Sequence, residues 1–278
     1  MPRLGVNCAA LVGRASPAVD LSGEDELLSL ESLLSLSLVT WARGTNVVLS
    51  GSDVTSMVDR VASGVGQRAV NSAHAFAVTS AAKPTLVTDF AGTLPAVRLA
   101  GSTALQSNIA ASNWKARHDG TSWLEYVVYR RHATGGTTQA LVTSRPGGVA
   151  PGAKVFSSSG GMTLYVTNAA DATVVLQSVS SAYAVGTASF FEWSYVSSRS
   201  PSNTRIQASL KTTSAFSVDQ SATPASGSPS GSLVIGAHAA NGLSEGASVD
   251  VAEYLGGVYS DALKTAVRRY LFLRYGLS

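Results

Sequence analysis

The chain has 278 residues, of which 45% are apolar and only 13% are charged, against about 25% charged residues in an ordinary globular protein. Its net charge of +3 is small, and its basic residues are scattered apart from pairs such as Arg130-Arg131. This distribution argues against a nucleic-acid-binding protein, which needs a basic patch to neutralise phosphates. The single cysteine, Cys8, excludes an intrachain disulfide framework and a multi-cysteine zinc site, so the core must hold the domain together.

The N-terminal segment predicts neither export nor membrane insertion. Its apolar stretch after Arg3 is broken by Asn7, Gly13 and Arg14, so it lacks the apolar core and cleavage site of a signal peptide. No window approaches the roughly 18 uninterrupted apolar residues of a membrane span. We therefore expect a protein without a signal peptide, used in the cytoplasm or in a particle assembled there.

Residues 1–30 differ in composition from the rest of the chain. An acidic run at residues 24–26 leads into a leucine-rich stretch over residues 27–38. Leucine spacings of three and four allow an amphipathic helix, whereas the alternation with serine between Leu34 and Leu38 indicates the start of a strand. We predict that residues 1–30 form an arm or short helix, and that residues 31–278 form one main domain.

The middle of the chain predicts an antiparallel β-structure. Short runs of β-branched and aromatic residues, several with period two, alternate with Gly, Pro, Asn and Ser, which is typical of a sandwich or barrel. No long helical pattern separates the runs, which argues against a parallel α/β sheet. Residues 214–230, rich in Ser, Pro and Gly, predict a long surface loop. The expected strands are 46–49, 85–87, 96–99, 122–129, 162–166, 173–176, 190–196, 205–210 and 232–236.

The C-terminus predicts a helix. Ser260 is a good N-cap, Asp261 suits the first turn, and Gly276 is expected to end the helix. This helix should lie on the sandwich and fix the end of the chain. Its apolar face is expected to hold Leu263, Val267, Tyr270 and Leu271, and its negative end Arg268, Arg269 and Arg274.

Three segments, taken in order, resemble a known family. They are residues 40–44 with 54–60, residues 83–87 with 95–102, and a strand at 252–255 followed by the capped helix ending in Tyr275-Gly276-Leu277. Together they resemble the concanavalin-A-like lectin or glucanase (laminin-G-like) domains of bacteriophage structural proteins and bacterial surface proteins. The resemblance runs from about residue 36 to the end. It implies an all-β, antiparallel jelly-roll β-sandwich with an adhesive or structural role, often with sugar recognition, although such a fold hosts many functions.

Two departures from the family pattern concern one turn. Met57-Val58-Asp59 stands where the family often has a tryptophan before a loop aspartate, and Ser63-Gly64-Val65-Gly66 replaces the usual Ser-Gly-Asn-Gly. These departures give no support to a metal or ligand role for this turn. No compact run of Asp and Asn suggests calcium, and the four histidines show no metal-ligand spacing, so no cofactor is expected.

Another interpretation of the sequence is a glycosidase, which would need a pair of carboxylates close together. A retaining glycosidase needs two carboxyl groups about 5 Å apart. The nearest candidates, Asp250 and Glu253, are three residues apart, and such residues on a regular strand point to opposite faces. The sequence therefore predicts a protein that is not an enzyme, with Glu253 solvated or locally paired.

Aromatic residues near polar ones offer a candidate ligand site. His118 and Asp119 adjoin Gly120 and Trp123 and would suit a ligand loop, although a turn leading into a strand explains them equally. Trp123 lies in a strong strand pattern, which favours core packing. Trp114, beside Asn113 and Lys115, is expected to be exposed and able to stack on a sugar. The candidate ligand-binding residues are Trp114, His118, Asp119 and Trp123.

The leading hypothesis is a bacteriophage virion structural protein, used as a capsid decoration, fibre or tail component. Its expected partners are other virion proteins or copies of itself, docked through the N-terminal arm, together with cell-surface glycans. A free bacterial carbohydrate-binding module or lectin is the alternative, and a glycoside hydrolase is the third. A free lectin predicts a monomer with glycan affinity, whereas a glycosidase predicts sugar release that is lost when one carboxylate is replaced.

Overall fold

The computed structural model describes most of the chain from residue 38 onward. The predicted arm over residues 1–30 lies outside the described residues, as do Cys8, His74 and His238. The described residues are 38–40, 47–58, 75–78, 82–101, 103–132, 139–145, 151–158, 161–168, 173–179, 185–200, 206–210, 214–218, 227–236 and 248–277.

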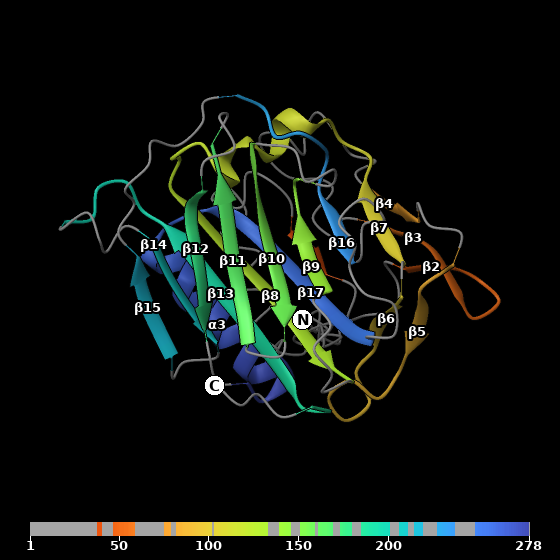
Figure 1. Ribbon diagram of the computed structural model, residues 1–278. Helices are drawn as coiled ribbons and strands as arrows, with labels where there is room; N and C mark the ends of the chain where they lie inside the picture. The colour runs from red at the N-terminus through yellow and green to blue at the C-terminus, as the bar shows by residue number, and fades with distance from the viewer. Residues whose placement is uncertain are drawn as a thin grey trace, which may run out of the picture.

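Antiparallel ladders join the described strands into one continuous sheet that folds over into two layers (Figure 1). The layers connect where Asp53 pairs with Thr85. The first layer runs in the order β15 (Ser214–Val218), β14 (Ile206–Leu210), β13 (Ala188–Tyr195), β8 (Trp123–Arg131), β17 (Ser248–Val258), β6 (Ala96–Ala100) and β5 (Thr85–Val87), and β1 (Leu38–Thr40) also pairs with β17. The second runs in the order β12 (Thr173–Val179), β11 (Gly161–Thr167), β10 (Gly152–Ser158), β9 (Gln139–Thr143), β16 (Val234–Gly236), β7 (Ala104–Ser107), β4 (Ala75–Val78), β3 (Asp53–Val58) and β2 (Val47–Ser50).

This arrangement confirms the predicted all-β, antiparallel jelly-roll class. Each strand expected in the middle of the chain is present, with ends shifted by a few residues. The loop predicted over residues 214–230 is wrong at its start, because Ser214–Val218 forms β15. The pairing of Leu210 with Ser214 and of Ile206 with Val218 makes β14 and β15 a hairpin, and this cross-strand pairing outweighs the local excess of serine.

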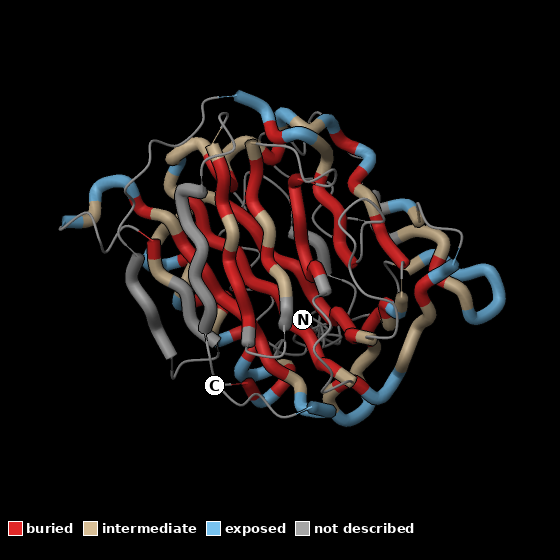
Figure 2. The backbone as a smooth tube through the Cα atoms, in the orientation of Figure 1, coloured by how far each residue is buried: buried red, intermediate tan, exposed pale blue. Residues whose placement is uncertain are grey.

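The central strands of the first layer are buried on both faces. All nine residues of β8 are buried, and red tube runs along the middle of both layers in Figure 2. Trp123, Val127 and Tyr129 point into the core between the layers. Leu124 and Tyr126 alternate with them and contact the C-terminal helix, α3 (Asp261–Tyr275). Because helix and second layer cover opposite faces, β8 has two apolar faces.

Helix α3 begins and ends where the sequence predicts. The Ser260 side chain accepts a hydrogen bond from Leu263 N at 3.0 Å, and Gly276 ends the helix in the left-handed conformation at φ 65°. The amide of Gly276 donates to the carbonyl of Phe272. The expected apolar residues Leu263, Val267, Tyr270 and Leu271 are all buried against the first layer.

Replacing Ser260 with alanine is expected to lower the free energy of unfolding by about 1 kcal/mol, because the Leu263 amide loses its capping acceptor. The comparison variant is Ser260→Asp, which keeps an acceptor and places a negative charge at the positive end of the helix. Urea unfolding of both variants checks this. Equal losses of stability in the alanine and aspartate variants would contradict the capping role.

A buried ion pair fixes the short helix η2 (Ala111–Arg117) between the two layers. The Arg117 guanidinium donates to both carboxylate oxygens of Glu125, at 2.6 and 2.8 Å, and neither side chain has exposed area. It also donates to Ser144 Oγ and to the Ala153 carbonyl of the second layer, both at 3.1 Å. Arg117 therefore links η2, the first layer and the second layer through one side chain.

Candidate functional site

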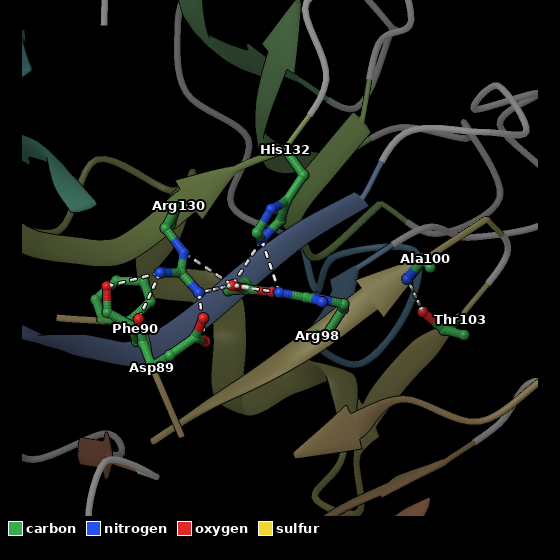
Figure 3. Close-up of polar contacts among 8 residues, drawn as sticks. Asp89, Phe90, Arg98, Ala100, Thr103, Arg130 and His132 are labelled. Carbon is green, nitrogen blue, oxygen red and sulfur yellow. Dashed lines mark hydrogen bonds and ion pairs between the residues drawn. The ribbon is translucent and has the colours of Figure 1, made fainter. Parts of the chain in front are cut away.

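A cluster of charged side chains lies where β6, β8 and β17 run side by side (Figure 3). Asp250 of β17 is directly opposite Arg98 of β6 on one side and Arg130 of β8 on the other. His132 follows β8, and Asp89 lies in the loop after β5. The strand register and the loop after β5 thus bring together these five residues, here called the Asp250 cluster, from three distant parts of the sequence.

Asp250 is the centre of the cluster. Its Oδ1 accepts a hydrogen bond from Arg98 Nε at 2.8 Å, and its Oδ2 accepts from Arg130 Nη2 at 2.7 Å. His132 Nε2 lies 2.6 Å from Oδ2 and 3.1 Å from Arg98 Nη2. Burial raises the pKa of Asp250, but the hydrogen bonds from Arg98, Arg130 and His132 outweigh it, so the net pKa is lowered. Asp250 is therefore ionised at neutral pH and held in one orientation.

Arg130 is fully used inside the cluster. Its Nε and Nη2 donate to Asp250, and Nη2 also donates to Asp89 Oδ1 at 2.8 Å. Its Nη1 donates to the carbonyls of Asp89 and Phe90, at 2.5 and 3.1 Å. Five hydrogen bonds occupy the five N–H groups of a guanidinium, so the role of Arg130 is to tie the β5 loop to the sheet.

Arg98 and His132 form the accessible side of the cluster. Their side chains are 35% and 26% exposed. Arg98 uses Nε and Nη2 inside the cluster, and among the described residues no group accepts a hydrogen bond from its Nη1. Since Asp250 fixes the guanidinium plane, two oriented N–H groups remain for ligand oxygens. Such a preset donor pair suits hydroxyl or carboxylate recognition.

The two tryptophans predicted to bind a ligand are core residues. Trp114, expected to be exposed, has no exposed area and packs in the core between the layers, so that expectation is wrong. The helical turn of η2 directs Trp114 inward although its neighbours Asn113 and Lys115 are partly exposed. Trp123 is also fully buried, and its Nε1 donates to Glu125 Oε2 at 3.2 Å. Neither indole offers a face to a ligand.

His118 and Asp119 lie in the turn after η2. His118 is buried, with Nε2 3.0 Å from the Gly227 carbonyl, and burial lowers its pKa. Among the described residues, its Nδ1 has no hydrogen-bond partner. Asp119 accepts a hydrogen bond from Thr121 N at 2.9 Å, as in a turn that leads into β8. A ligand role for this pair stays a prediction.

The expected geometry of Asp250 and Glu253 is wrong. A bulge in β17 interrupts its pairing with β8 between Val251 and Glu253. Val251 and Tyr254 both point into the core between the layers, while Glu253 accepts hydrogen bonds from Tyr270 and, at 2.9 Å, from Tyr275 of α3. The extra residue thus turns Glu253 to the helix side, the same face as Asp250. The structure confirms that Glu253 is locally paired.

The described residues hold no group of three or more His, Cys, Asp and Glu side chains placed to bind a metal ion. No helix in the described ranges is both long and apolar enough to cross a membrane.

These features define the class of the fold: an antiparallel jelly-roll β-sandwich with a C-terminal helix on the outer face of one layer. No protein-family model and no curated protein matches the sequence. Among solved structures, the chain is similar to the botulinum neurotoxin serotype D binding domain, with a TM-score of 0.54 and 10% identity over 90% of this chain and 53% of that one.

Two further similar structures belong to neurotoxins that interact with sugars or glycolipids. One is the serotype D ligand-binding domain in complex with N-acetylneuraminic acid, with a TM-score of 0.50, 10% identity and coverage of 90% and 53% of the two chains. The other is botulinum neurotoxin type C, whose access to cells depends on interaction with two ganglioside molecules. It has a TM-score of 0.52, 9% identity and coverage of 88% and 53%. The chain spans about half the length of these binding domains, and such low identity establishes a shared fold alone.

Proposed function

We propose that this chain is a non-catalytic, lectin-type binding domain that recognises glycans as part of a bacteriophage virion, in a capsid decoration, fibre or tail component. The observation that carries the glycan part is the Asp250 cluster, because it presents the oriented N–H groups of Arg98 beside the partly exposed His132. Sugar hydroxyls and carboxylates are ligands that such charge-assisted donors bind well. The similar structures support the same proposal, since one is a complex with N-acetylneuraminic acid and another belongs to a neurotoxin whose access to cells depends on interaction with two ganglioside molecules.

Two carboxylates of the first layer, Asp250 and Glu192, are held by arginine side chains, and this supports a non-catalytic role. Glycoside hydrolysis needs a carboxylic acid whose pKa is raised so that it can give a proton to the leaving oxygen. Glu192 of β13 accepts hydrogen bonds from Arg268 of α3, at 2.6 and 3.0 Å. In Asp250 and Glu192 burial raises the pKa, but hydrogen bonds and charges from arginine, led by Arg98 and Arg268, lower it below the ordinary value. Both carboxylates therefore stay ionised at neutral pH.

The virion part of the proposal rests on the sequence resemblance, above all on the strand and capped helix ending in Tyr275-Gly276-Leu277. Electron cryo-microscopy of purified particles tests it. Repeated copies, with residues 1–30 ordered against a neighbouring protein, would support a structural component. A free monomer in sizing chromatography with light scattering that is retained on a glycan column would instead favour the free lectin.

Replacing Arg98 with alanine is expected to weaken glycan binding by about tenfold or more, since a hydrogen bond to a charged group contributes about 1.5–3 kcal/mol. Binding of the intact chain to a glycan array measures this, with calorimetry on each glycan retained. Arg269→Ala, on the exposed side of α3, is the matched arginine control and should bind as the wild type does. Equal binding by Arg98→Ala, with its fold confirmed by circular dichroism, would remove the Asp250 cluster from glycan recognition.

A further inference from the structure

A second group of basic and aromatic side chains lies on the outer face of the second layer. Lys154 and Phe156 of β10 are partly exposed, whereas Ala153 and Val155 between and beside them are buried in the core. Strand alternation therefore places Lys154 and Phe156 on the outer face. Tyr165 of β11 is the cross-strand partner of Lys154 and shares this face. Figure 1 shows β10 and β11 side by side in this layer, with α3 on the far side of the sandwich.

Each aromatic ring in this group makes a cation–π contact with a basic side chain. Lys154 Nζ lies 5.0 Å from the centre of the Phe156 ring, and the Arg145 guanidinium carbon lies 5.1 Å from the centre of the Tyr165 ring. Because Lys154 and Tyr165 are opposite each other in the ladder, the two cation–aromatic pairs are neighbours. Lys154, Phe156, Tyr165 and Arg145 are here called the Lys154 patch. Its lysine and its two rings are partly exposed, whereas Arg145 is buried.

The ammonium of Lys154 has no anionic partner in the described part of the chain. No described residue accepts a hydrogen bond from its Nζ or forms an ion pair with it. Burial, and then the positive charge of Arg145, lower the pKa of Lys154. Withdrawing an ammonium from water beside a second cation is unfavourable unless an anion compensates for it. The aromatic rings supply only part of this compensation.

We propose that the Lys154 patch binds the carboxylate of an acidic saccharide through the partly exposed Lys154 ammonium, with the buried Arg145 guanidinium adding positive charge beside it. The patch is separate from the Asp250 cluster, since the two lie on different layers of the sandwich. The choice of a saccharide rests on the proposed glycan-binding function, while the need for an anion follows from the patch itself.

The position of the patch within the sheet argues against an acidic peptide as the ligand. Strand β10 is paired with β9 and β11, and β11 is paired with β10 and β12. Their backbone groups are already used in ladders, so a peptide has no open edge on which to add a strand. A compact acidic group that meets only side chains fits this surface better.

A glycan array with matched neutral and carboxylated oligosaccharides, such as lactose and sialyllactose, tests the proposal on the intact chain. We expect sialyllactose to bind at least tenfold more tightly than lactose, and this preference to weaken as salt is added. Lys154→Met should remove the preference, Lys154→Arg should retain most of it, and the exposed control Lys83→Met should leave it unchanged.

The outcomes separate this inference from the proposed function. Glycan binding that Lys154→Met leaves intact, or binding limited to neutral glycans, would overturn the Lys154 site and leave the proposed function standing. Binding to no member of the array would overturn both. The melting temperature distinguishes a binding role of Lys154 from a structural one, because replacing a structural lysine would lower it. Lys154→Met should melt at the same or a higher temperature than the wild type, because it removes an uncompensated, partly buried charge, as is common at binding sites.

Discussion

Replacing Arg117 with methionine is expected to lower the free energy of unfolding by about 3–5 kcal/mol, since it leaves a buried charge without its partner. The Glu125 carboxylate would keep only the neutral donors Trp123 Nε1 and Tyr254 Oη, at 3.2 and 3.1 Å. Ser144 Oγ and the Ala153 carbonyl would lose a donor as well. Urea unfolding measures the loss. Hydrogen exchange should become faster in residues 111–118, because Arg117 ties this helical segment to both layers.

Two further variants decide whether the charge or the packing of Arg117 matters. Arg117→Met combined with Glu125→Leu removes both charges and is expected to recover much of the lost stability, as replacing a whole buried ion pair by apolar residues often does. Arg269→Met, at an exposed position of α3, should change stability by no more than about 0.5 kcal/mol. A single Arg117 variant as stable as this control would show that water or another donor compensates Glu125.

Local signals explain which elements the sequence predicts well. Helix α3 is predicted at both ends because Ser260 and Gly276 act on their own neighbouring backbone groups. Strands β8 and β13 are predicted because β-branched and aromatic residues favour a pleated, buried surface whatever their partners. Strands β7 and β10, with sequences ALQS and GAKVFSS, carry no such pattern. They form because neighbouring strands pair with them, and this pairing is not encoded within either segment.

The candidate site was harder to predict for the same reason. Arg98 and Arg130 are charged residues inside apolar strand runs, which signals that each needs a buried partner. The identity of that partner depends on strand register, and Asp250 is 152 residues from Arg98 and 120 from Arg130. Local neighbours were misleading for Trp114, because adjacent residues on a helical turn point in different directions. The bulge that turns Glu253 towards α3 has no glycine or proline to mark it.

Replacing Asp250 with asparagine is expected to lower the free energy of unfolding at neutral pH by about 2–3 kcal/mol, because charge-assisted hydrogen bonds from two arginines are lost. Asparagine retains the shape of the side chain but removes the charge that Arg98 and Arg130 share, so that only the exposed Asp89 still forms an ion pair with Arg130. Solvent limits the effect, since the Arg98 side chain is 35% exposed. Urea unfolding at pH 7 measures the loss, and Asp53→Asn, at a position where the structure describes no ion pair, is the matched control.

The same variant should change how stability depends on pH. The pKa of Asp250 is lower in the folded chain than the ordinary value of about 3.9, so its contribution is fully present above that value. It is lost as the pH falls from about 3.9 through the folded pKa, where protonation breaks the bonds to Arg98 and Arg130. Unfolding at a series of pH values should therefore show a shallower acid-side decline for Asp250→Asn than for the wild type. Glu192, whose pKa is also lowered, leaves a residual slope in both. Identical slopes would contradict the prediction, because they would mean that the ion pairs with Arg98 and Arg130 do not lower the pKa of Asp250 in the folded chain.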